Sequence, residues 1–123
     1  MPKQPSEYLR HVLDECRFIL AATSGMVKEQ FFEDEVMKRA VVRSLEIIGE
    51  ASKRIPDDVK LNCQSVNWKN MAGMRDRLIH DYVGVNYSIV WDVVVNKIPE
   101  LEKQIAAAID DLPNEKNAND TCG

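Results

Sequence analysis

The sequence predicts an all-α protein, built as a four- to five-helix up-and-down bundle. Glycine and proline occur only five times each in 123 residues, so few positions interrupt a helix. Between them, apolar residues recur every three or four positions, which gives a helix one apolar face. With 45% hydrophobic residues, the chain has material for one core. We expect a single domain over residues 1–112 and a polar, disordered tail over residues 113–123.

The first two helices follow from their caps and their apolar stripes. Ser6 is expected to cap the first helix, which ends near residues 23–25. The second helix begins somewhere within residues 28–34 and stops at Pro56, with Gly49 allowing close contact with another helix. The two stripes consist of Leu9, Val12, Leu13, Cys16, Ile19 and Leu20, and of Val36, Ala40, Val41, Leu45, Ile48, Ala51 and Ile55.

A loop and a third helix come next. Residues 56–66 read as a loop with room for one helical turn at residues 57–61. Asn67 is a good cap for a third helix over about residues 68–83, and Gly84 is expected to close that helix. The third helix carries most of the chemically interesting side chains.

The C-terminal helices are the most apolar. The fourth begins at Asn86 or Ser88 and is apolar almost all round, which predicts a central position or a subunit interface. Pro99 either kinks this helix or begins a fifth helix in its first turn. The apolar stripe of this fifth helix consists of Leu101, Ile105, Ala108, Ile109 and Leu112.

Charge and cysteine content limit the class of protein. A formal charge of −4 argues against a surface that is basic throughout, so any contact with nucleic acid should be local. The three cysteines, Cys16, Cys63 and Cys122, form no CxxC pair and fit reduced thiols. The N-terminus has no apolar leader, and no uncharged run is long enough to span a bilayer. These features predict a cytoplasmic protein without membrane contact.

Arg75, Asp76 and His80 stand out in the third predicted helix. On a helical wheel Arg75 falls within the apolar arc, so its guanidinium should pair with a carboxylate, for which Glu46 and Glu50 are candidates, or face a polar cleft. Asp76 precedes His80 by four residues, where it could orient or acidify the imidazole. An ideal helix places Arg75 and His80 about 140° apart, so they converge only through side-chain reach or a partner subunit.

These residue types suit RNA cleavage without a metal. That reaction needs a base for the 2′-hydroxyl proton, an acid for the leaving 5′-oxygen and a cation for the charged phosphorane. The chain has only two histidines, His11 and His80, and His11 has no motif around it. Two copies of His80 across a symmetric dimer are the simplest two-histidine site. No metal-ligand spacing and no glycine-rich phosphate loop occur, so neither a metal nor a cofactor is expected.

Arg75, His80 and Tyr82 together resemble the RX4HXY signature of HepT proteins, a branch of the HEPN superfamily. The resemblance extends over roughly residues 6–112 and includes the stretch 40–51 and both flanks of the motif. It implies a helical bundle that forms a homodimer, with a composite cleft and metal-independent ribonuclease activity towards RNA. It also implies a toxin–antitoxin system, in which a MntA-type nucleotidyltransferase antitoxin transfers AMP from ATP to Tyr82. Arg75 and His80 would be catalytic and Asp76 supporting.

Each of these residues also has a structural interpretation. His80 could be a surface or capping histidine, Arg75 could form a salt bridge between the second and third helices, and Tyr82 could lie in the core. Arg77 and Lys69 are expected to be solvated surface residues. Two other functions remain open: a non-catalytic helical substrate-binding subunit of a nucleotidyltransferase, which would not need His80, and a helical dimer with a structural role.

Overall fold

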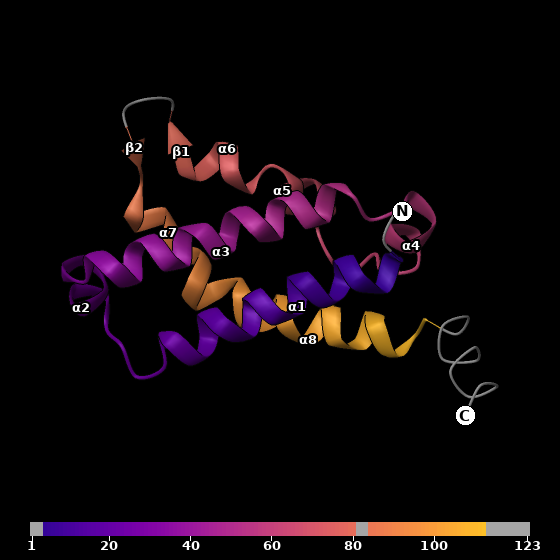
Figure 1. The fold of residues 1–123 in the computed structure, drawn as a ribbon, viewed down its shortest axis with the longest axis horizontal. Coiled ribbons are helices and arrows are strands. Elements are labelled where there is room, and N and C mark those ends of the chain that lie inside the picture. The colour runs from indigo at the N-terminus through magenta and orange to yellow at the C-terminus, as the bar shows by residue number, and fades with distance from the viewer. Residues whose placement is uncertain (1–3, 81–83, 113–123) are drawn as a thin grey trace.

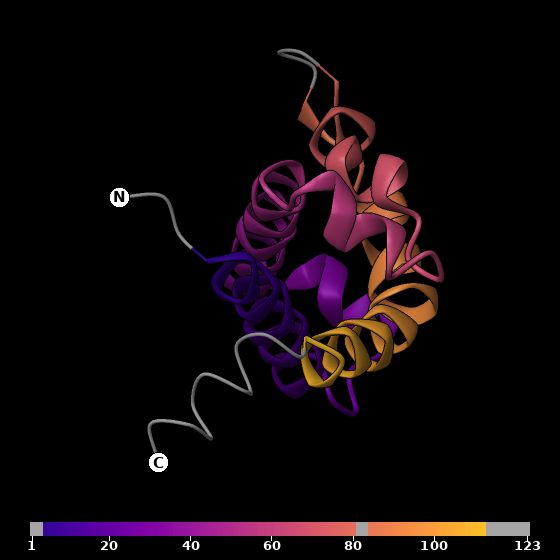
Figure 2. The same cartoon turned by 90° about the vertical axis from the view of Figure 1, so that its right-hand side faces the viewer.

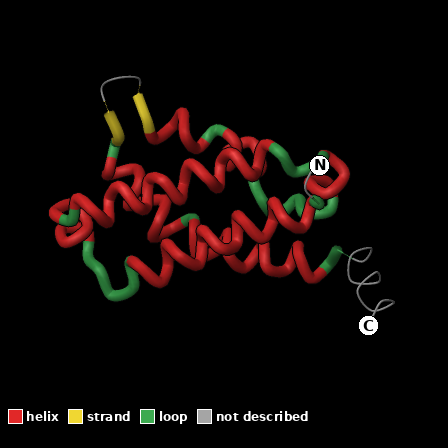
Figure 3. The backbone as a smooth tube through the Cα atoms, viewed as in Figure 1, coloured by secondary structure: helices red, strands yellow, loops and turns green. Residues whose placement is uncertain are grey.

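The computed structural model describes residues 4–80 and 84–112, and in them the chain is all-α apart from one hairpin of two short strands (Figure 3). The expected tail, 113–123, lies outside the described residues. The elements are α1 (Pro5–Ala22), α2 (Lys28–Glu33), α3 (Glu35–Lys53), α4 (Asp57–Leu61), α5 (Trp68–Ala72), α6 (Met74–Leu78), β1 (Ile79–His80), β2 (Gly84–Val85), α7 (Tyr87–Asn96) and α8 (Ile98–Asp110).

Four segments run up and down along the long axis of the molecule, as the sequence predicts (Figure 1). They are α1, α3, the α5–α6 pair and the α7–α8 pair, each antiparallel to the one before it. The end-on view shows these segments arranged round a common interior, with α3 between α1 and the α5–α6 pair (Figure 2). The fully buried side chains that fill this interior include Leu9, Ile19, Leu45, Ile48, Ile98 and Ile105.

Two helix starts differ from the prediction. Ser6 does not cap α1, because the helix begins at Pro5 and Gln4 occupies the cap position without a side-chain bond. Proline is favoured in the first helical turn, where its missing N–H costs nothing. The expected second helix is interrupted at Asp34, whose carboxylate accepts a bond from the Met37 N–H at 2.9 Å and thereby starts α3.

Helices α4, α7 and α8 follow the prediction more closely. The helical turn α4 forms in the loop, and the side chain of Asn86 caps α7 by accepting from the Ile89 N–H at 3.2 Å. Pro99 lies in the first turn of α8, so a fifth predicted helix begins there. In α7, Val90, Val93 and Val94 are buried while Val95 is 50% exposed. One face of α7 is therefore buried in the core, and another face exposes apolar side-chain surface.

Candidate functional site

The motif lies on a segment built from very short elements. The side-chain oxygen of Asn67 accepts a bond from the Asn70 N–H at 3.0 Å and caps α5, as predicted. The Trp68 indole N–H donates to the Cys63 carbonyl at 3.1 Å, which ties the start of α5 to the preceding loop. Helices α5 and α6 have five residues each. Since isolated helices of this length are unstable in water, packing on α3 must hold the segment in place.

The continuous third helix expected over residues 68–83 is wrong. It is interrupted at Gly73, the C-cap of α5, and α6 ends at Leu78. Glycine is a poor helix former, so the interruption occurs where the intrinsic preference for helix is lowest. Beyond Leu78 the chain forms a hairpin in which Ile79 pairs with Val85 and His80 with Gly84. The Leu78 carbonyl accepts from the Asn86 N–H at 3.0 Å, which stabilises this turn of the chain.

Gly84 therefore does not close a helix. It lies in β2 with φ +111°, a conformation that glycine adopts much more readily than other residues. The β-branched residues Ile79 and Val85 pair in the hairpin, and such residues favour strands. The hairpin stands at one end of the bundle, beyond α6 and beside the start of α7 (Figure 1).

Arg75 is placed at the junction of α6 and α3. Its Nε lies 3.5 Å from Oε2 of Glu46, one of the two carboxylates proposed from the sequence. Glu50, the other candidate, lies 3.6 Å from Lys53 Nζ instead. The Arg75 side chain is 53% exposed, because the buried face of this segment is formed by Met71, Met74 and Leu78 and Arg75 lies at its flank. A salt bridge that leaves half the side chain in solvent keeps the guanidinium accessible to a ligand.

The other motif residues lie on both sides of the end of α6. Asp76 is exposed in α6, and the backbone of His80 is in β1. The expected i−4 geometry between Asp76 and His80 does not apply, because the helix ends between them. The helical-wheel angle between Arg75 and His80 fails for the same reason, so their relative direction depends on the hairpin. Tyr82 lies outside the described residues.

The motif segment approaches α3 closely at one point. A Cβ added to Gly49 would lie 3.3 Å from the Met71 carbonyl oxygen and 3.9 Å from that of Ala72. The predicted role of Gly49 in close helix contact is confirmed. α5 thus rests against the backbone of α3 at Gly49, and α6 contacts α3 again at Glu46. These two contacts position Arg75.

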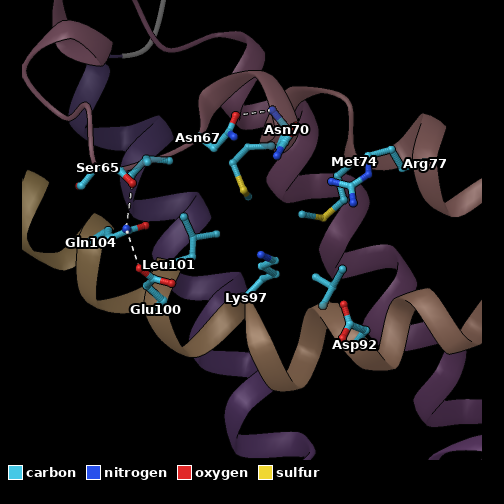
Figure 4. Close-up of a pocket in the computed structure, with 13 residues that line it drawn as sticks. Ser65, Asn67, Asn70, Met74, Arg77, Asp92, Lys97, Glu100, Leu101 and Gln104 are labelled. Carbon is cyan, nitrogen blue, oxygen red and sulfur yellow. Dashed lines mark hydrogen bonds between the residues drawn. The ribbon is translucent and has the colours of Figure 1, made fainter.

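A cavity of about 180 Å³ lies on the other side of α6 (Figure 4). Arg77 lines it and Arg75 does not, as expected for residues about 200° apart on a helix. Its charged side chains are Arg77, Lys97, Asp92 and Glu100, two of each sign, around a floor that includes Met71 and Met74. We expected Arg77 to be a surface residue only; its position two residues after Arg75 is the sequence feature that places it on this opposite side.

Two further properties concern metals and membranes. Over residues 4–80 and 84–112, no three His, Cys, Asp or Glu side chains gather where they could hold a metal ion. Within the same ranges, none of the helices combines the length and the apolar character needed to cross a bilayer. Cys16 and Cys63 are free, buried thiols.

Fold and site together define a small helical-bundle domain that presents a half-exposed arginine beside a histidine-bearing hairpin. Comparison with known proteins makes this specific: a model described as "Ribonuclease HepT-like" matches residues 12–108. The chain belongs to this HepT-like ribonuclease family, as the resemblance predicted.

Three relatives match over most of their own length. A protein of Caldanaerobacter subterraneus subsp. tengcongensis described as a putative RNase is 52% identical over 84% of this chain and 92% of its own. One described in the same way from Methanocaldococcus jannaschii is 42% identical over 94% of this chain and 96% of its own. A protein of Thermococcus cleftensis described as "Probable ribonuclease HepT" is 40% identical over 83% of this chain and 93% of its own. No solved structure gives a significant match.

Proposed function

We propose that the chain is a metal-independent ribonuclease and the toxin of a HepT/MntA-type toxin–antitoxin system, located in the cytoplasm. The observation that carries the proposal is the half-exposed guanidinium of Arg75, held by Glu46 at 3.5 Å and only five residues before His80. Family membership and the descriptions of the relatives as RNases support the same chemistry.

The reaction uses the groups in complementary roles. A base removes the proton of a ribose 2′-hydroxyl, the 2′-oxygen bonds to the adjacent phosphorus, and the bond to the 5′-oxygen breaks as an acid protonates that oxygen. Arg75 would stabilise the charge that builds on the phosphate oxygens. Base and acid would be the two copies of His80 in a homodimer, whose composite cleft brings two motifs together. Asp76 would support the site from α6.

The dimer has a candidate surface. The fourth predicted helix, now α7, leaves Val95 50% exposed, and exposed apolar side chains are a common component of subunit interfaces. Sedimentation at micromolar concentration should give a two-fold dimer. A stable monomer that still cleaves RNA would contradict the composite site.

The decisive experiment is cleavage of RNA by the purified chain in EDTA. Arg75→Ala and His80→Ala should each lower the rate by roughly a hundredfold or more, because each removes a group used in the transition state. Arg77→Ala is a matched control, since it removes an exposed arginine from the same short helix on its opposite side. Helicity should stay unchanged in all three variants. Cleavage that persists in both motif variants would contradict the roles of Arg75 and His80, whereas no cleavage by the intact chain would favour the alternative, a non-catalytic helical substrate-binding subunit of a nucleotidyltransferase.

Regulation would act through Tyr82. Its phenolic oxygen would attack the α-phosphate of ATP on the MntA-type antitoxin, forming a phosphodiester to AMP and releasing pyrophosphate. The attached phosphate would repel RNA and compete for Arg75. Mass spectrometry after incubation with the antitoxin and ATP should map one adenylate to Tyr82, and Tyr82→Phe should escape modification. Adenylate on Tyr8 or Tyr87, or inhibition without any adenylate, would contradict this mechanism.

A further inference from the structure

A second pocket lies away from the motif, between α1 and α3, and has a volume of about 190 Å³. Its polar side chains come from both helices and include His11, Arg43, Glu50 and Arg54. We propose that this pocket binds a backbone phosphate of the RNA substrate, with Arg43 and Arg54 as the cations. The inference rests on the proposed ribonuclease function and extends it by assigning a substrate-binding site outside the motif.

The charge in the pocket carries the proposal. Arg43 and Arg54 form no ion pair with any residue in the described ranges. Glu50 is the one carboxylate in the lining, and Lys53 lies 3.6 Å from it and offsets its charge. Two arginines without an ion pair in the described ranges therefore line a hollow with an excess of positive charge. Guanidinium groups bind phosphate oxygens through paired N–H donors, so a phosphate is the ligand that this arrangement fits.

The neighbouring side chains add hydrogen-bond donors. His11 and Tyr8, whose side chains carry an imidazole and a hydroxyl, line the pocket from α1, together with Arg43 of α3 and Arg54, the C-cap of α3. Both side chains are only partly buried, so they are accessible to a ligand. Ile47 and Ala51 supply the apolar wall. This gives His11, which the motif does not use, a role in binding.

Comparison with the cavity in Figure 4 favours the pocket between α1 and α3. The cavity beside α6 has two cationic and two anionic side chains in its lining and so has no preference for an anion. The α1–α3 pocket has an excess of cations on a chain whose formal charge is −4. Because the acidic chain as a whole repels RNA, attraction has to come from a local site of this kind.

The position of the pocket suits a strand that also reaches the motif. Glu46, which holds Arg75, lies on α3 between Arg43 and Arg54. At 1.5 Å per helical residue, Arg43 is about 4.5 Å and Arg54 about 12 Å from Glu46 along the axis. α3 lies between α1 and the α5–α6 pair (Figure 2). The pocket at α1 and Arg75 on α6 therefore lie on the two sides of the same helix. One RNA strand across α3 would contact both sites.

The test measures RNA binding separately from cleavage. Binding of a fluorescent single-stranded RNA is followed by anisotropy in the His80→Ala chain, so that the probe stays intact, at several salt concentrations. Adding Arg43→Gln and Arg54→Gln should weaken binding about tenfold and lower the slope of log affinity against log salt by about 0.7, as expected for one lost single-strand phosphate contact. Replacing Arg43 with lysine instead of glutamine in this double variant should restore part of the RNA affinity and most of the salt slope, because lysine keeps the positive charge. Lys103→Gln is a control, because it removes one exposed charge that lines neither pocket.

Each outcome decides the proposal. A selective loss in the double variant, with helicity and dimer mass unchanged, supports it. Unchanged binding and slope in the double variant overturn it while leaving the ribonuclease proposal intact, provided that the His80-containing chain still cleaves RNA. A double variant that becomes monomeric, or that binds RNA normally but loses its nucleotidyltransferase partner, assigns the pocket to a protein interface and also overturns it. No RNA binding by the His80→Ala chain, together with no cleavage by the intact chain, overturns both proposals.

Discussion

The two sides of α3 are stabilised in different ways. On one side lies α1, which also packs against α8; these helices have 18 and 13 residues and bury continuous apolar stripes. On the other, α5 and α6 have five residues each and lead into strands of two residues. Long helices contribute stability through the area they bury, whereas such short ones depend on what they contact. The motif therefore sits on the part of the fold that depends most on its neighbours.

The largest change in stability is expected at a fully buried position of α3. Leu45→Ala removes a side chain with 0% exposure from α3 and should lower the free energy of unfolding by about 2–5 kcal/mol, because it loses buried area and leaves a cavity. Urea denaturation followed by circular dichroism measures this. Leu61→Ala makes the same chemical change at a leucine that is 67% exposed, and it should change stability by no more than about 0.5 kcal/mol. Similar effects in both variants would show that burial on α3 does not dominate.

The long helices were predictable because their apolar stripes are local features, although the caps of α1 and α3 differ from the prediction. The Asn67 cap of α5, the Asn86 cap of α7 and the start of α8 one residue before Pro99 also each follow from one side chain acting on the next turn of backbone. The site was less predictable. Glu46 was one of two candidate carboxylates for Arg75, but the exposure of this arginine was not foreseen, since it depends on Met71, Met74 and Leu78 forming the buried face of the segment. Residues 79–80 leave the helix because they pair with residues 84–85. Such pairing depends on contacts between separate segments, which helical periodicity does not show.

A second prediction concerns Cys16, which is buried between the long helices. Burial, reinforced by the negative charges of Glu102 and Glu15, raises the pKa of this thiol from 9.0 to about 12. The folded state therefore holds the proton more tightly than the unfolded state. Stability from this site is complete below about pH 9 and falls as the pH rises from 9 to 12, by a few kcal/mol at most.

Unfolding measured in urea between pH 7 and 11 tests whether the Cys16 thiol has a higher pKa in the folded state than in the unfolded state. The native chain should lose stability at alkaline pH more steeply than Cys16→Ala, and Cys16 should react with a thiol reagent only on unfolding. Cys63, whose pKa burial also raises, is the comparison thiol near α4. Parallel pH curves for the native chain and Cys16→Ala would mean that the α1–α8 side is more open to solvent than its burial suggests.

The smallest expected effect on stability lies at Gly73, where it should be accompanied by a loss of function. At this position a Cβ would meet only the Lys69 carbonyl oxygen, at 3.4 Å, and the φ of −88° suits any residue. Gly73→Ala should therefore raise or leave unchanged the free energy of unfolding, by about 1 kcal/mol at most, through better helix propensity. The same preference favours joining α5 and α6 into one helix, which would shift Arg75 relative to Glu46. RNA cleavage should then fall while stability does not.

Gly49→Ala tests the other contact of the motif segment, the one between α5 and α3. The added Cβ would lie 3.3 Å from the Met71 carbonyl oxygen, so the α5 backbone has to move by a few tenths of an ångström. It should lower both stability and cleavage, since the close contact with α3 is what holds the motif segment. If Gly73→Ala instead keeps full cleavage, the interruption between α5 and α6 does not set the position of Arg75, and the contact with Glu46 alone is sufficient. If Gly49→Ala is as harmless as Gly73→Ala, the motif side does not depend on α3 in the way that its short helices imply.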